Sequence, residues 1–174
     1  MKRGPHYEDL PKDLKFLVIV TSDTIASKRS KGDDFQDISG EVAVSLIKRA
    51  KFTVVDRIYL PNNIKAIREE VCSATSKGSA DVVIISGGTG IGTRDVTVEA
   101  VSPILDKVIP GFGELFRRLS YERIGNPAIA SRALAGVSNG DLVFALPGSP
   151  DAVKLALGMI ILKESPHLLK MARR

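Results

Sequence analysis

Three short apolar runs place the strongest limits on how this chain folds. They are Phe16 to Val20 (FLVIV), Val82 to Ile85 (VVII) and Leu142 to Leu146 (LVFAL). Runs of this length without polar alternation are typical of strands buried on both faces, as in parallel sheets. Phe52 to Leu60 (FTVVDRIYL) is predicted as a further strand. A sheet of such strands needs helices on both of its faces.

Segments with helical periodicity separate these strands. Helices are predicted over residues 38–49, 64–77, 97–105, 114–124, 128–135 and 151–169. Residues 26–37 are polar and interrupted by Gly32, which predicts a surface loop, and Asn139-Gly140 predicts a turn. The resulting order, β-α-β-α-β-loop-α-α-α-β-α, predicts an α/β fold with a mostly parallel central sheet.

Length and composition favour a single domain of ordinary globular character. The 174 residues are predicted to form one domain over residues 16–170, preceded by an N-terminal arm over residues 1–15. The net charge of +5 favours anionic partners, but scattered basic residues and only 5% aromatic residues argue against nucleic acid. The single cysteine, Cys72, is expected to be a small core residue. One cysteine and no signal peptide favour the cytoplasm, and no apolar run has the length of a membrane span.

The stretch that follows the apolar run Val82 to Ile85 has the composition of an anion site. Four glycines follow Ser86 within six positions, namely Gly87, Gly88, Gly90 and Gly92. Arg94 and Asp95 close the loop, and Thr97 stands where the next helix is expected to be capped. Glycine lets backbone N–H groups approach a phosphate, and the start of a helix favours negative charge. The alternative is a tight strand-to-helix turn without a ligand.

Common phosphate and metal motifs are absent. A P-loop needs lysine where residues 91–94 have none, and the dinucleotide fingerprint needs glycine where this chain has Thr93. His6 and His167 stand near opposite ends of the chain. Neither a histidine-cysteine metal cluster nor a Ser-His-Asp triad is therefore predicted.

Three carboxylates remain as candidates for chemistry. Asp23, Asp37 and Asp95 each stand near a strand end or a helix start, and the carboxyl ends of parallel strands meet at one edge. Each has a structural alternative: Asp37 as a helix cap, Asp95 as a cap or partner of Arg94, and Asp23 as support for its own turn. Together they suit Mg²⁺, which binds one or two carboxylates along with phosphate oxygens. This combination indicates metal-assisted phosphoryl or nucleotidyl transfer.

Five motifs resemble the MoaB/MogA family of molybdenum cofactor biosynthesis proteins. They are TSDT (Thr21–Thr24), DISG (Asp37–Gly40), SGGTGIGTRDVT (Ser86–Thr97), PGFGELFR (Pro110–Arg117) and LPGSP (Leu146–Pro150). The resemblance runs from about Phe16 to Leu169, and the length and N-terminal arm are more similar to the MoaB branch.

The resemblance implies a fold, an assembly and a reaction. The fold is a three-layer α/β/α sandwich that binds molybdopterin, and the assembly is a homo-oligomer, trimeric in the MogA branch and commonly hexameric in the MoaB branch. The reaction is adenylylation, in which molybdopterin and ATP give adenylyl-molybdopterin and pyrophosphate with Mg²⁺. A downstream metal-insertion protein is a further implied partner.

The resemblance also implies roles for individual residues. Asp37 in D-x-S-G and Asp95 in R-D-V-T match the catalytic carboxylates, which are expected to hold Mg²⁺. The expected set of substrate- and nucleotide-binding residues is Ser22, Asp23, Ser39, Gly40, Ser86, Gly87, Gly88, Thr89, Gly90, Arg94, Pro147, Gly148 and Ser149. The molybdopterin phosphate would attack the α-phosphorus of ATP. Backbone N–H groups of Gly88 to Gly90 would stabilise the developing charge, with help from Arg94.

Two alternatives to adenylylation are considered for this sequence. The first is a non-catalytic molybdopterin-binding or carrier protein of the MoaB branch, against which the retention of both Asp37 and Asp95 argues. The second is a related domain acting on other nucleotides, as in CinA-type proteins, which have Asp-Thr-Asn where this chain has Asp37-Ile38-Ser39-Gly40. The residues are consistent with a trimer or a hexamer and with a molybdenum or a tungsten pathway.

Overall fold

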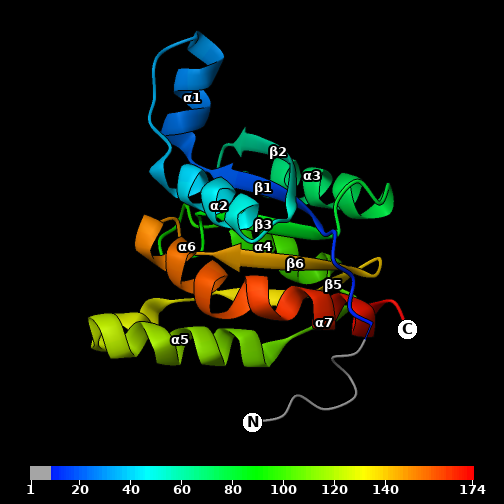
Figure 1. Ribbon diagram of the computed structural model, residues 1–174. Coiled ribbons are helices and arrows are strands. Elements are labelled where there is room, and N and C mark those ends of the chain that lie inside the picture. Colours follow the sequence, from blue (N-terminus) through cyan, green and yellow to red (C-terminus); the bar gives the residue numbers. More distant parts are fainter. Residues whose placement is uncertain (1–8) are drawn as a thin grey trace.

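The centre of the molecule is a six-stranded sheet with strand order β2-β1-β3-β6-β5-β4 (Figure 1). The computed structural model describes residues 9–174. The parallel strands are β1 (Lys15–Thr21), β2 (Thr53–Leu60), β3 (Val82–Ser86) and β6 (Asp141–Leu146). An antiparallel edge is added by β5 (Leu134–Ser138) and β4 (Lys107–Val108). The prediction of a mostly parallel sheet is confirmed.

Helices cover both faces of the sheet and give three layers (Figure 1). One face carries α2 (Ile38–Arg49), α5 (Pro110–Ile124), α6 (Pro150–Ala156) and α7 (Leu162–Ala172). The other face carries α3 (Ile64–Ser76) and α4 (Thr97–Val101). Successive side chains of a strand point to opposite faces, so Phe16 and Val18 enter the first core and Leu17 and Ile19 the second. The expected α/β/α sandwich is confirmed.

Aromatic packing fixes α5 against the sheet. The ring of Phe112 meets that of Phe144 on β6 edge to face, with 5.1 Å between centroids, and lies 6.2 Å from that of Phe116. All three side chains are buried. Truncating such a ring to alanine typically costs about 3–5 kcal/mol, so this cluster determines where α5 lies.

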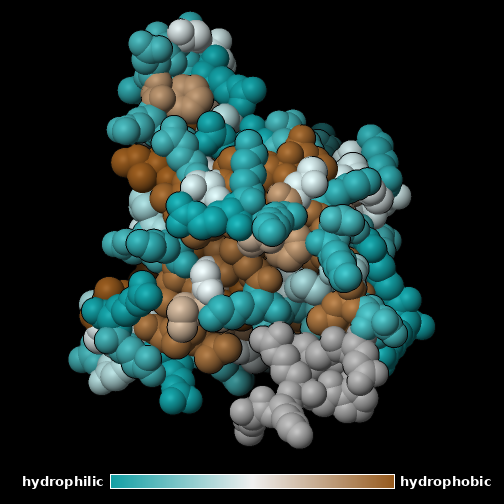
Figure 2. Space-filling view, in the orientation of Figure 1, coloured by the Kyte–Doolittle hydropathy of each residue, from teal (hydrophilic) through white to brown (hydrophobic). Residues whose placement is uncertain are grey.

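The predicted loop over residues 26–37 is wrong in its first half, which is helical. Helix α1 (Asp23–Lys31) begins at the cap Ser22 and ends at Gly32, whose φ is +74°. Figure 1 shows α1 projecting from the body, and in Figure 2 most of the surface of this projection is hydrophilic. None of its residues is buried. A helix without a buried face leaves no apolar periodicity in the sequence, which explains why the prediction missed it.

The predicted helix over residues 128–135 is also wrong. A 3₁₀ segment, Asn126–Ala130, is followed by β5, which pairs antiparallel with β6. The predicted turn at Asn139 and Gly140 is confirmed, with φ of +52° and +82°. Alanine-rich composition favours a helix, but pairing along β6 overrides that local preference.

Two other expectations hold only in part. The helix predicted over 97–105 stops at α4 and continues as a 3₁₀ segment, Ser102–Ile104, because Pro103 has no N–H for a helical bond. Cys72 is partly buried and stands outside both cores.

The predicted final helix is present, with a π-helical turn, Leu157–Ile161, between α6 and α7. Over residues 9–174, no helix is both long and apolar enough to cross a membrane.

Candidate functional site

The loops expected to form the site do meet at one edge of the sheet. In the strand register, Val20 pairs with Ser86, and Ser86 pairs with Leu146. The segments that follow β1, β3 and β6 therefore leave the sheet side by side. Ser86 itself is fully buried, and its Oγ has no hydrogen-bond partner among the described residues.

The turn after β3 requires glycine at its first two positions. Gly87 and Gly88 have φ of +112° and +65°. A Cβ at Gly87 would lie 2.3 Å from the carbonyl oxygen of Thr21, and one at Gly88 would lie 2.4 Å from Oγ1 of Thr97. Thr97 donates through Oγ1 to the carbonyl of Gly87 at 2.8 Å. The cap expected at Thr97 is wrong by one residue: Val96 is the N-cap of α4, and Thr97 is the first residue of the helix.

Asp95 folds back over the second half of the loop. Its Oδ2 accepts a hydrogen bond of 3.0 Å from the backbone N–H of Gly92. A Cβ at Gly90 would lie 2.6 Å from the same oxygen, so the small residue leaves room for the carboxylate. The other carboxylate oxygen of Asp95, Oδ1, makes no hydrogen bond with any of residues 9–174.

An arginine that sequence reasoning missed holds this loop from outside. Arg132 precedes β5, and its Nε donates to the carbonyl of Gly90 at 2.8 Å, while Nη2 donates to the carbonyl of Asp95 at 3.0 Å. Its guanidinium also pairs with Glu99 on α4. Hydrogen bonds from Arg132 lower the pKa of Glu99 below its ordinary value. No local motif marks Arg132, because its partners are distant in sequence.

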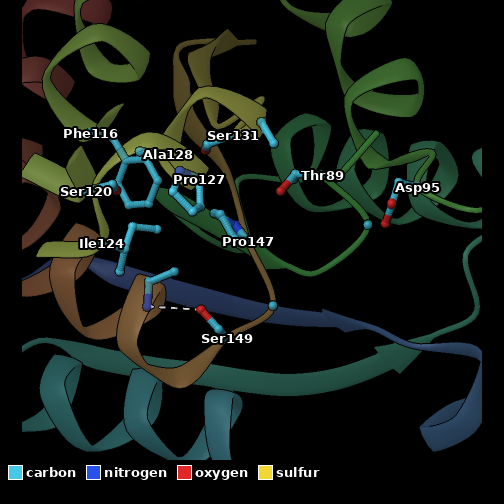
Figure 3. Close-up of a pocket in the computed structure, with 15 residues that line it drawn as sticks. Thr89, Asp95, Phe116, Ser120, Ile124, Pro127, Ala128, Ser131, Pro147 and Ser149 are labelled. Carbon is cyan, nitrogen blue, oxygen red and sulfur yellow. Dashed lines mark hydrogen bonds between the residues drawn. The ribbon is translucent and has the colours of Figure 1, made fainter. Parts of the chain in front are cut away.

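A cavity of about 360 Å³ lies beside this loop. Figure 3 shows Thr89 and Asp95 toward one end of it and apolar side chains such as Phe116 and Pro127 toward the other. The lining comes from residues 87–95, here called the Gly-rich loop, from α5, from the 3₁₀ segment Asn126–Ala130, and from the loop after β6 with the start of α6. It consists of Gly88, Thr89, Gly90, Asp95, Phe116, Ser120, Ile124, Pro127, Ala128, Ala130, Ser131, Pro147, Gly148, Ser149 and Ala152. The cavity thus combines a polar end with an apolar end.

The loop after β6 packs against the Gly-rich loop. The N–H of Gly87 donates to the carbonyl of Leu146 at 3.0 Å. A Cβ at Gly148 would lie 3.2 Å from the Cα of Gly87, so two glycines allow the loops to touch. Ser149 caps α6, with its Oγ accepting from the N–H of Ala152 at 3.3 Å (Figure 3). Pro147, Gly148 and Ser149 therefore lie with Gly88 to Gly90 around one cavity.

Asp37 lies outside the lining of this cavity. It is buried at the start of α2, and its Oδ1 accepts hydrogen bonds from the N–H of Gly40 at 2.8 Å and from Oγ of Ser39 at 3.1 Å. Its Oδ2 lies 3.5 Å from Nη1 of Arg57 and has no hydrogen bond. Burial raises the pKa of Tyr59 on β2, and the nearby negative charge of Asp37 raises it further. The structural alternative given for Asp37, a helix cap, is therefore present in the structure.

Ser22, Asp23 and Arg94 form a third group. Ser22 caps α1. Oδ1 of Asp23 accepts from the N–H of Asn62 at 2.8 Å, and its Oδ2 lies 3.6 Å from Nε of Arg94. Arg94 therefore pairs with Asp23 rather than with Asp95, which was its expected alternative partner. The side chain of Arg94 is 82% exposed and is free to reorient toward an anion.

The donors at the cavity fit a hard cation that shares its ligands with a phosphate. Among residues 9–174, no group of three or more His, Cys, Asp or Glu side chains is arranged to hold a metal ion. Mg²⁺ does not need such a cage, since it binds one or two carboxylates together with phosphate oxygens. Asp95, with one oxygen outside any hydrogen bond, meets that requirement.

The fold and the site together define a class: a three-layer α/β/α protein with a polar and apolar cavity at the carboxyl ends of its parallel strands. The model of a family described as "Probable molybdopterin binding domain" matches residues 17–168. The chain belongs to this family, and within it to the MoaB branch.

Relatives of known name match along nearly the whole chain. Molybdenum cofactor biosynthesis protein B of Bacillus cereus is 40% identical over 164 residues, which cover 94% of this chain and 93% of that protein. A Methanocaldococcus jannaschii protein named probable molybdopterin adenylyltransferase is 37% identical over 158 residues, 91% of this chain and 93% of its own. The crystal structure of tungsten cofactor synthesizing protein MoaB from Pyrococcus furiosus gives a TM-score of 0.82 at 39% identity, covering 94% of this chain and 99% of that chain.

Proposed function

We propose that the chain catalyses the Mg²⁺-dependent adenylylation of molybdopterin by ATP, which gives adenylyl-molybdopterin and pyrophosphate. The observation that carries this proposal is the two-ended cavity. Its apolar end suits a flat heterocycle, and its other end combines a glycine-rich loop with the carboxylate of Asp95. A relative that is 37% identical bears the name probable molybdopterin adenylyltransferase.

The proposed reaction is a displacement at phosphorus. A phosphate oxygen of molybdopterin forms a bond to the α-phosphorus of ATP, and the bond from that phosphorus to the bridging oxygen of pyrophosphate breaks. Mg²⁺ bound to the phosphates supplies charge neutralisation. Backbone N–H groups from Gly88 to Gly90 donate to phosphate oxygens, and they are available because no hydrogen bond among the described residues uses them.

The two proposed catalytic carboxylates have unequal support from their surroundings. Asp95 lines the cavity and would be a direct ligand of the metal. Asp37 is proposed as the second carboxylate, and its Oδ2 has no hydrogen bond, but Arg57 lies 3.5 Å away. Ser22, Asp23, Ser39, Gly40, Ser86 and Arg94 stay proposed binding residues, with Arg94 free to neutralise phosphate charge through its exposed side chain.

We also propose that the protein acts as a homo-oligomer, a trimer or a hexamer, in the cytoplasm. Exposed apolar side chains at the end of α5 and beyond support a subunit contact: Tyr121 is 59%, Ile124 is 60% and Ile129 is 88% exposed. Burying such side chains against a second copy is favourable. Light scattering on the purified chain tests the assembly. A downstream metal-insertion protein is the proposed recipient of the product.

Product formation tests the proposed reaction. The purified protein is incubated with molybdopterin, ATP and Mg²⁺, and adenylyl-molybdopterin and pyrophosphate are quantified. We expect equal amounts of both, with none when EDTA is present or when ATP is replaced by its α,β-methylene analogue, whose α–β bridge resists cleavage. Tight molybdopterin binding without either product would support the carrier function instead. The observation that favours the carrier function is that Asp37 pairs with Arg57 and does not line the cavity.

A further inference from the structure

Arg132 connects two parts of the chain that are far apart in sequence. It lies between the 3₁₀ segment Asn126–Ala130 and β5, and it donates to the carbonyl of Gly90, which is 42 positions earlier. Its other contacts are the carbonyl of Asp95 at 3.0 Å, a longer one of 3.4 Å to the carbonyl of Thr89, and the carboxylate of Glu99. One guanidinium thus spans both ends of the loop segment from Thr89 to Asp95.

The planar guanidinium suits this task better than any other side chain. Its N–H groups project in a fixed fork, so one arginine can hold two backbone carbonyls and a carboxylate in one arrangement. Glu99 balances the charge of Arg132. Arg132 is not among the side chains that line the cavity, whereas its neighbour Ser131 is. Arg132 therefore acts on the cavity through the loop and not by direct contact with a ligand.

The contacts of Arg132 also set the direction of the loop's N–H groups. A trans peptide points its N–H opposite to its C=O, and the described chain contains no cis peptide. Because the carbonyls of Thr89 and Gly90 point to Arg132, the N–H groups of Gly90 and Ile91 point away from it. The N–H of Gly90 has no hydrogen-bond partner among residues 9–174. It is left for an anion.

We propose that Arg132 is a positioning residue that holds the Gly-rich loop in the conformation in which its N–H groups bind phosphate. The inference rests on the proposed function only for the identity of the anion, the phosphate chain of ATP. Loss of the arginine frees the carbonyls of Gly90 and Asp95, so the loop samples conformations in which the N–H groups of Gly90 and Ile91 are no longer held in one direction.

Three variants separate this role from general stabilisation. Arg132→Gln removes the fork, Arg132→Lys keeps the charge without it, and Arg68→Gln is a matched control. Arg68 on α3 also donates to backbone carbonyls of α4, those of Ala100 at 3.3 Å and Glu99 at 3.4 Å, but among residues 9–174 it makes no hydrogen bond to the loop. Each variant is measured for thermal unfolding, amide hydrogen exchange, Mg-ATP binding by calorimetry, and the KM for ATP and kcat of adenylylation.

We expect both Arg132 variants to fold. Amide exchange should be faster by about tenfold or more at Gly87, Gly92 and Asp95, whose N–H groups are hydrogen-bonded, as follows from the loss of two hydrogen bonds. The dissociation constant of Mg-ATP and the KM for ATP should rise by a similar factor, with a smaller change in kcat. Arg68→Gln should leave loop exchange and ATP binding at wild-type values.

Three results would overturn the inference. They are unchanged loop exchange and ATP affinity in Arg132→Gln, restoration of both by Arg132→Lys, and equal losses in Arg68→Gln. The first shows that the fork is dispensable, the second that charge alone suffices, and the third that the effect comes from a loosened α4. If the wild type makes no adenylylated product, the proposed reaction fails, but loop exchange and Mg-ATP binding still decide the role of Arg132.

Discussion

The guanidinium of Arg57 on β2 lies 3.5 Å from the buried carboxylate of Asp37 at the start of α2. The same carboxylate accepts hydrogen bonds from the N–H of Gly40 and the hydroxyl of Ser39. Asp37 is therefore a helix cap in the structure as it stands. Its proposed second role, toward Mg²⁺, needs variants that separate capping from charge.

Replacing Asp37 by asparagine and by alanine makes that separation. Asparagine caps a helix about as well as aspartate, whereas alanine loses the cap at a cost of about 1 kcal/mol. We expect Asp37→Ala to unfold at lower denaturant than Asp37→Asn, and both to lose adenylylation if the charge is required. Asn63→Ala, which removes the cap of α3 outside the site, is the control for lost capping alone. Full turnover in Asp37→Asn would exclude Asp37 as a catalytic carboxylate.

Gly88→Ala should impair both stability and ligand binding. Its φ of +65° strains any residue with a Cβ by about 1–2 kcal/mol. The added Cβ would also lie 2.4 Å from Oγ1 of Thr97 and 2.9 Å from Oδ1 of Asn62. Gly78→Ala is a matched control, because Gly78 has φ of +59° and open space around its missing side chain.

Chemical denaturation and Mg-ATP calorimetry compare the two glycine variants. Gly78→Ala should lose stability through backbone strain alone and bind Mg-ATP as the wild type does. Gly88→Ala should lose more stability and weaken Mg-ATP binding as well. Equal behaviour of the two variants would show that close packing at Gly88 has no part in forming the site.

The pair of Glu99 and Arg132 predicts a change of stability in mild acid. Hydrogen bonds from Arg132 hold the pKa of Glu99 below its ordinary value of 4.5 in the folded state. As pH falls below 4.5, the unfolded chain therefore binds more protons than the folded one. The contribution of the Glu99–Arg132 pair to the free energy of unfolding is present above that pH and is lost as pH falls through the folded pKa. Because the Glu99 side chain is 46% exposed, the contribution should stay under about 1 kcal/mol.

Glu99→Gln removes that titration. Denaturation at a series of pH values from mildly acidic down to strongly acidic should give a shallower fall in unfolding free energy for Glu99→Gln than for the wild type. Parallel curves would mean that Glu99 titrates alike in the folded and unfolded chains, and that the pair with Arg132 does not stabilise the fold.

The sequence predicted the parts of the fold that burial makes visible. The apolar runs that became β1, β3 and β6 are buried along their length, and residues 38–49 became α2 with Asp37 as its cap. Helix α1 escaped prediction because it buries no residue. Strand β5 escaped because the alanine-rich residues 128–135 favour a helix, and β5 gains its conformation only by pairing with β6.

The candidate site was predictable where it lies in one continuous stretch. The Gly-rich loop and the loop after β6 do surround one cavity, as their positions after parallel strands suggest. The apolar wall from α5 and the restraint from Arg132 were missed, since both depend on contacts between distant segments. The partner of Arg94, Asp23, is the first residue of helix α1, a pairing that spacing along the chain does not reveal.

Asp95→Asn tests the central proposal most directly. The asparagine keeps an oxygen for the N–H of Gly92, so the loop should fold and molybdopterin should still bind. Without the negative charge, the metal loses its proposed ligand at the cavity. Asp56→Asn, at an exposed position on β2, is the control for loss of one carboxylate. The measurement is the rate of adenylyl-molybdopterin formation with ATP and Mg²⁺: we predict that it is lost in Asp95→Asn and kept in Asp56→Asn, and a wild-type rate in Asp95→Asn would contradict the proposal.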